Sequence, residues 1–117
     1  MKSEFIELSV DSKKLVELAV EYWRLEKRIS KVSDSLNSDQ NESFANSLKK
    51  FERFFRMNDI AVEDYAGMKY NEGMNVDILS MEKMTDIEYT KIHETVEPTV
   101  FVKGQLVRKA KVIIHEK

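Results

Sequence analysis

An apolar stripe near the start of the chain constrains its fold more than any other feature. Its members recur at alternating steps of 3 and 4 residues: Leu15, Leu18, Tyr22, Leu25, Ile29, Val32 and Leu36. This spacing puts them on one narrow face of an α-helix, and no Gly or Pro interrupts residues 12–36. Asp11 or Ser12 can cap the first turn. The pattern predicts a long helix of the kind found in coiled coils and helical bundles.

A second helical pattern begins after a polar break at residues 37–41. Its apolar residues also recur at helical spacing, and they are Phe44, Leu48, Phe51 and Phe55. Asn41 or Ser43 can cap the start of this helix. Because the connection is short, we expect the second helix to return antiparallel to the first and form a hairpin.

This hairpin carries more apolar surface than two helices can cover for each other. Burying one large apolar side chain is worth roughly 1.5–3 kcal/mol, so exposure of the whole set is costly. We therefore expect two hairpins to pair by two-fold symmetry into a four-helix bundle. The predicted dimerisation residues are Leu18, Tyr22, Leu25, Ile29, Phe44, Leu48, Phe51 and Phe55. The alternative is a monomer whose C-terminal segment folds over the hairpin.

The hydrophobic pattern changes after Gly67 from helical to extended. Residues 68–78 are interpreted as strand or extended loop, and residues 81–89 as loop. Strands are predicted at 99–102 and 106–114 around a tight turn at Lys103 and Gly104, with a further short strand near Ile92 and Val96. The sequence thus predicts an α+β fold. Residues 1–66 form the helical hairpin and dimerisation region, and residues 67–117 form a small antiparallel β-wing.

Composition excludes several classes of protein. The 117 residues include no Cys, which rules out disulfides, thiol nucleophiles and Cys-ligated metals. His93 and His115 lie far apart in sequence, so we expect no metal site, and no catalytic motif or phosphate-binding glycine loop is present. We therefore expect no enzyme activity and no cofactor. No apolar run approaches the roughly 20 residues of a membrane span, and we expect a cytoplasmic protein.

Basic residues cluster on both predicted helices although the net charge is −2. The first cluster comprises Arg24, Lys27, Arg28 and Lys31, and the second Lys49, Lys50, Arg53 and Arg56. Solvated helix faces account for such clusters. A nucleic-acid-binding module is the alternative, but the chain has neither a net positive field nor an aromatic platform on a strand.

The C-terminal segment resembles the closing pattern of GrpE-type nucleotide exchange factors, which are cochaperones of DnaK-type chaperones. In that pattern a turn Gly is followed by a hydrophobic pair, an Arg, a small residue and a Val-rich last strand. The matching positions are Gly104, Val107, Arg108, Ala110 and Val112. A weaker similarity extends the resemblance to about residues 44–114. Residues 97–100 depart from the family's usual Lys-Gly-Tyr segment, and the long N-terminal coiled coil is missing or reduced to the first helix.

The resemblance implies a divergent, shortened exchange factor that acts as a homodimer. Its β-wing would bind the nucleotide-binding domain of a DnaK-type chaperone and promote ADP release. The partner-binding residues that it implies are Phe101, Gly104, Val107, Arg108, Lys109 and Lys111. Because a fold does not determine an activity, a non-catalytic dimeric adaptor or scaffold with the same architecture remains the alternative.

Overall fold

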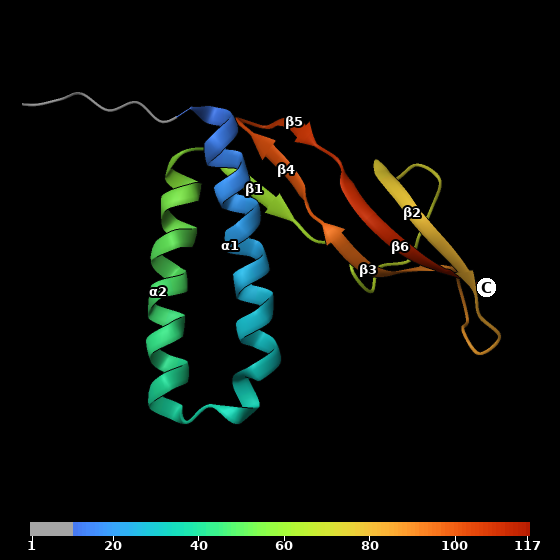
Figure 1. Cartoon of the computed structure of the whole chain (residues 1–117). Helices are drawn as coiled ribbons and strands as arrows, with labels where there is room; N and C mark the ends of the chain where they lie inside the picture. The colour runs from blue at the N-terminus through green and yellow to red at the C-terminus, as the bar shows by residue number, and fades with distance from the viewer. Residues whose placement is uncertain (1–10) are drawn as a thin grey trace, which may run out of the picture.

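The computed structural model describes residues 11–117, which form two helices followed by two small sheets (Figure 1). The helical elements are α1 (Ser12–Val32), a short 3₁₀ helix η1 (Ser33–Ser35) and α2 (Ser38–Met57). The strands are β1 (Ile60–Glu63), β2 (Val76–Lys83), β3 (Lys91–Glu97), β4 (Thr99–Val102), β5 (Gln105–Arg108) and β6 (Ala110–Glu116). The predicted α+β class, with helices first and strands after, is confirmed. Neither helix within residues 11–117 combines the length and the apolar character that crossing a bilayer requires.

The two helices form the predicted hairpin, and capping residues set where each begins. Asp11 precedes α1, and its carboxylate accepts a hydrogen bond from a first-turn amide at 2.9 Å. Asn37 starts α2 through a capping box: its side chain accepts from the amide of Gln40 at 2.8 Å, and the Gln40 side chain accepts from the amide of Asn37 at 3.0 Å. The prediction of a later cap at Asn41 or Ser43 is wrong, because this reciprocal pair satisfies the free amides earlier in the chain.

The strands β3 to β6 make one long bent hairpin that is shared between two sheets. Sheet A has the order β1-β4-β5, and sheet B has the order β2-β6-β3. β3 leads into β4 through Pro98, and β5 leads into β6 through Lys109. Pro98 has no N–H and cannot extend a ladder of hydrogen bonds, so the hairpin is interrupted where the sheets meet. Both halves of the hairpin are antiparallel.

Three predictions for the β-wing are wrong. The single antiparallel sheet is instead two sheets, and β2 runs parallel to β6. The predicted return strand at 106–114 is divided at Lys109 between β5 and β6. The predicted loop at 81–89 starts too early, because β2 continues to Lys83. The pairing of β2 with β6 shifts register at Leu79, and this irregularity removes the strict alternation that identifies a strand in a sequence.

Two hydrophobic cores hold the molecule together. The first lies between the hairpin and sheet A, and its buried residues are Val16, Ala19, Val20, Phe55, Ile60 and Val100. The second lies on one face of sheet B under the connection between β1 and β2, and its buried residues are Ile92, Ala110, Val112 and Ile114. α1 therefore buries the residues beside the predicted stripe rather than the stripe itself, because that neighbouring face packs against the β-region.

Candidate functional site

The turn between β4 and β5 contains Lys103 and Gly104, at the position where the sequence predicts a tight turn. Gly104 has φ 77° and Lys103 has φ 52°, and Gly adopts such positive values without steric cost. The amide of Lys103 donates a hydrogen bond to the carbonyl oxygen of Asp59 at 2.8 Å. This bond ties the turn to the short connection between α2 and β1. The β4–β5 end of the wing therefore rests against the hairpin, near the start of α1 (Figure 1).

Val107 and Arg108, on β5, face the first turns of α1. Together with Val16 they help to line an open hollow of about 330 Å³, and the side chain of Val107 is half exposed. A guanidinium nitrogen of Arg108 lies 3.9 Å from a carboxylate oxygen of Glu17. An ion pair this long and this exposed contributes little to stability. The guanidinium is thus held only loosely by contacts within the described part of the chain.

The other predicted partner-binding residues are spread along the wing. Phe101 is half-buried within sheet A, and Lys109 is exposed between β5 and β6. Lys111 lies in sheet B with its ammonium 3.5 Å from a carboxylate oxygen of Glu97. The six predicted residues therefore form two groups. One group lies at the β4–β5 end of sheet A, and the other lies near the start of β6.

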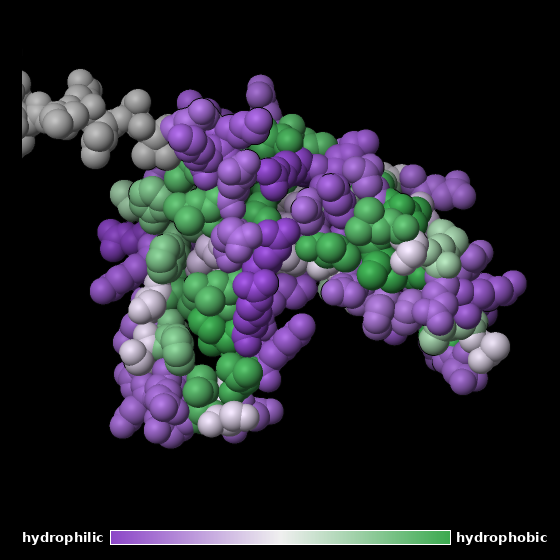
Figure 2. All heavy atoms as spheres, in the orientation of Figure 1, coloured by the Kyte–Doolittle hydropathy of each residue, from purple (hydrophilic) through white to green (hydrophobic). Residues whose placement is uncertain are grey.

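One face of the hairpin exposes a continuous apolar stripe. The exposed fractions are 48% for Leu18, 44% for Leu25, 43% for Phe44, 44% for Phe51 and 45% for Phe54. Figure 2 shows hydrophobic surface along the groove between the two helices, over much of the hairpin. Three of these residues help to line an open hollow of about 480 Å³: Leu18, Phe51 and Phe54. Apolar side chains gathered in this way mark an interaction surface, whereas isolated ones do not.

The remaining predicted dimerisation residues are partly or fully buried within the chain: Tyr22, Ile29, Leu48 and Phe55. The ring of Tyr22 stacks on Phe51 with 5.8 Å between centroids and tilts against Phe55 at 5.5 Å. Its hydroxyl oxygen lies 2.9 Å from a carboxylate oxygen of Glu26 and 3.2 Å from the carbonyl oxygen of Leu48. Burial, followed by the hydrogen bond to Glu26, raises the pKa of Tyr22, so this hydroxyl stays protonated. These contacts hold the two helices together within one chain.

A group of side chains centred on Asp64 fastens α1 to the segment that enters the wing. Trp23 Nε1 donates to Asp64 Oδ2 at 3.2 Å, and Lys27 Nζ donates to the same oxygen at 2.8 Å. The amide of Ala66 donates to Asp64 Oδ1 at 2.9 Å. Burial raises the pKa of Asp64, but the hydrogen bonds from Lys27, the Ala66 amide and Thr95 outweigh it and hold the pKa below its usual value. We call this group the Asp64 clamp.

Glu97, at the end of β3, makes a second link between α1 and sheet B. Its two carboxylate oxygens each lie 3.5 Å from a cation, one from Arg24 of α1 and the other from Lys111 of β6. Sequence reasoning missed both Glu97 and Asp64. No local pattern identifies them, since their partners on α1 are distant in sequence. In comparisons with known proteins, no family model and no curated protein matches this chain.

Proposed function

We propose that this chain is a GrpE-like cochaperone that promotes ADP release from a DnaK-type chaperone by binding its nucleotide-binding domain through the β-wing. One observation carries the proposal: the motif residues Gly104, Val107 and Arg108 lie together at one end of a β-region that follows a helical hairpin. A helical hairpin followed by strands agrees with the coarse arrangement that the resemblance implies, although the strands form two sheets and not one. The basic and apolar side chains at this end of the wing are accessible to a partner.

The proposal includes a second copy of the chain on the apolar stripe. The stripe follows both helices, and a two-fold axis would pair it with itself to make a four-helix bundle. Charges of both signs border it, with Glu21 and Arg28 beside the stripe on α1 and Lys50 beside it on α2. If the two-fold axis runs parallel to the helices, the α1 border of each copy faces the α2 border of the other. A second copy therefore matches the stripe in length and in apolar character.

Exchange then follows from preferential binding to one state of the chaperone. A factor that binds the open nucleotide cleft more tightly than the closed one shifts the equilibrium by its difference in affinity. Moving a two-state equilibrium from 1:99 to 99:1 takes a preference of about 10⁴-fold. ADP loses its closed-state contacts in the open cleft and dissociates. This mechanism requires only that the chain has a binding surface for the chaperone. On that surface, Arg108 would pair with acidic groups and Val107 would contact apolar ones.

Displacement of fluorescent ADP from the DnaK-type chaperone of the same organism tests the proposal. We expect the chain to increase the release rate in a saturable manner. Arg108→Ala should raise the concentration needed for half-maximal acceleration, by about tenfold for the loss of one charge-assisted contact. Its melting temperature should stay close to wild type, because Arg108 makes only a long, exposed ion pair within the chain. Lys49→Ala, on an exposed position of α2, is the control and should leave release unchanged.

The outcomes separate the proposal from its rival. Absence of acceleration at saturating concentrations of the chain would refute the exchange activity. Chaperone binding without acceleration would favour the alternative, a non-catalytic dimeric adaptor or scaffold with the same fold. If Arg108→Ala unfolds the chain, Arg108 has a structural role and the assignment of this contact is wrong.

A further inference from the structure

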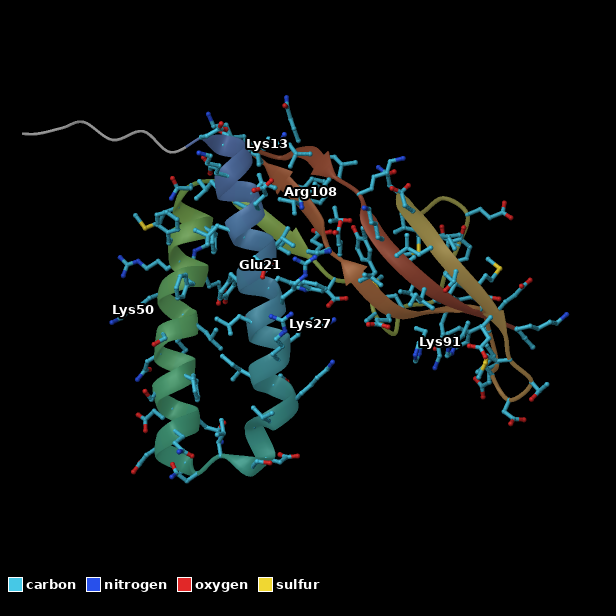
Figure 3. All side chains as sticks on the ribbon, in the orientation of Figure 1. Lys13, Glu21, Lys27, Lys50, Lys91 and Arg108 are labelled. Atoms are coloured by element: carbon cyan, nitrogen blue, oxygen red, sulfur yellow. The ribbon has the colours of Figure 1, made fainter. Side chains whose placement is uncertain are left out.

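The flank of α1 that faces sheet B carries a row of four basic residues: Arg24, Lys27, Arg28 and Lys31. Figure 3 shows Lys27 on this flank of α1, towards the wing, and Lys50 on the far side of the hairpin. The row forms one wall of a groove of about 370 Å³, and residues 93–96 of β3 form the other. Trp23 and Ala66 also line it. We call this hollow the α1–β3 groove.

Two of the four cations are already neutralised within the chain. Arg24 pairs with Glu21 and Glu97, and Lys27 pairs with Asp64. Arg28 and Lys31 differ, because neither has a carboxylate within 4.0 Å among residues 11–117. Both are exposed on the outer half of the row. The groove thus presents two unpaired positive charges beside a fixed set of ion pairs.

The other surfaces of the groove restrict what can occupy it. Val96, with an exposed fraction of 36%, offers apolar contact, and His93 adds a polar ring. Glu94 contributes a carboxylate to the same wall. Two unpaired cations beside carboxylates are a poor site for a polyphosphate chain, whose affinity rises with every phosphate that is neutralised. They suit a short segment with a few carboxylates and an apolar side chain between them.

We propose that the α1–β3 groove binds an acidic peptide segment of the protein partner, with Arg28 and Lys31 pairing to its carboxylates. The inference rests on the proposed function where it takes that partner to be the chaperone. It adds a docking site distinct from the β4–β5 end of the wing. Arg28 and Lys31 are three residues apart on α1, which is about 4.5 Å along the helix and matches two carboxylates on an extended or helical segment. Docking here brings the partner against both α1 and β3.

Fluorescence anisotropy with a fluorescein-labelled deca-glutamate peptide, at low salt, tests the groove itself. The double variant Arg28→Glu/Lys31→Glu should weaken binding by about tenfold or more, because two ion pairs with the peptide are lost and the reversed charges repel its carboxylates. The matched control is Lys49→Glu/Arg53→Glu, which changes the net charge equally on exposed positions of α2. The control should change binding less than twofold. Melting temperature and solution mass should match wild type in both variants, which excludes unfolding or altered self-association as the cause.

Three results would overturn the groove as an acidic-peptide site. The first is failure of the wild-type chain to bind the peptide, and the second is an equal loss in both double variants. The third is tighter binding of a ten-nucleotide oligo-dT than of deca-glutamate, which would make the row a nucleic-acid site instead.

ADP release separates this inference from the proposed function. If both are right, Arg28→Glu/Lys31→Glu weakens peptide binding and also raises the concentration of chain needed to accelerate release. If the wild-type chain and this variant accelerate ADP release equally well, the exchange function stands and the groove is not the chaperone's docking site. If the peptide binds through the groove but no release is accelerated, the groove stands and the exchange function is wrong.

Discussion

Asp64 connects α1 to the segment that enters the wing through one carboxylate. It accepts hydrogen bonds from Trp23 and Lys27 on α1 and from the amide of Ala66, which follows it in the connection to the wing. Lys27 also lies 4.5 Å from the centroid of the Trp23 ring, so its position is restrained from two sides. The carboxylate therefore does more than balance a surface charge. It holds the first helix at a defined distance from the wing.

Neutralising this carboxylate should weaken the chain in a pH-dependent way. The folded state lowers the pKa of Asp64 below 3.8, so its contribution to stability is complete well above pH 3.8 and is lost as the pH falls through the lowered pKa. Asp64→Asn should therefore reduce the free energy of unfolding at pH 7 by about 1 kcal/mol, allowing for partial exposure. The difference from wild type should shrink as the pH falls below 3.8. Urea unfolding between pH 7 and pH 3 measures both effects.

Glu63→Gln is the matched control for this prediction. Its carboxylate is adjacent in sequence but takes no part in the Asp64 clamp, and it lies near the hydroxyl of Tyr65 instead. A loss at pH 7 equal to that of Asp64→Asn would show that any charge in this segment has the same effect. That result would contradict the special role of Asp64.

At the scale of the elements, the important feature is the crossing where the long hairpin passes from sheet A to sheet B. Thr99 begins β4 and is buried, with an exposed fraction of 1%. Its hydroxyl accepts a hydrogen bond from the amide of Ala110, the first residue of β6, at 3.0 Å. Pro98 precedes it and cannot donate. One side-chain hydroxyl thus satisfies a buried backbone donor at the point where the ladder of strand hydrogen bonds is interrupted.

Replacing that hydroxyl should destabilise the wing. Thr99→Val keeps the shape of the side chain but leaves the buried amide of Ala110 without an acceptor, which costs about 1–3 kcal/mol. Thr99→Ser retains the hydroxyl and should cost clearly less. Thermal unfolding followed by circular dichroism measures the two variants. If Thr99→Val is as stable as Thr99→Ser, this hydrogen bond does not support the crossing.

The sequence predicts the helices better than the strands, for physical reasons. The stripe from Leu15 to Leu36 has a sustained period, so the first helix follows from it as far as Val32, beyond which η1 leaves Leu36 outside the helix. β1 gives no comparable signal, because its four residues follow α2 closely and complete a sheet only by pairing with β4. The sequence pattern also does not predict all of the α1 residues that are buried. Ala19 and Val20 are buried by sheet A, which a helix pattern alone cannot reveal.

The candidate site was predictable only where its signal is local. The turn at Lys103 and Gly104 follows from a Gly between two apolar runs, and the structure has this turn. The Asp64 clamp and the link through Glu97 join residues 37 and 73 positions apart. Such contacts arise from tertiary packing, so only the folded chain reveals them. The α1–β3 groove exists for the same reason, since its walls come from the first helix and the third strand.

At the scale of the whole molecule, the chain consists of a hairpin and a wing that are joined at one side (Figure 1). Sheet A covers one face of the hairpin, and the apolar stripe is left on another (Figure 2). The stripe is therefore available for a second copy without displacing the wing. In such a dimer each wing remains accessible, so one chain can bind a partner while the other completes the bundle.

The most direct measurement of this arrangement is the solution mass of the chain by light scattering at micromolar concentration, with Leu25→Asp alongside. Wild type should have twice the mass of one chain. Leu25→Asp should raise the dimer dissociation constant by about 100-fold or more, because it buries an unpaired charge, while the half-exposed position lets each monomer stay folded. Lys49→Asp, on an exposed position of α2, should remain dimeric. A wild-type chain that is monomeric at these concentrations would contradict the proposed bundle.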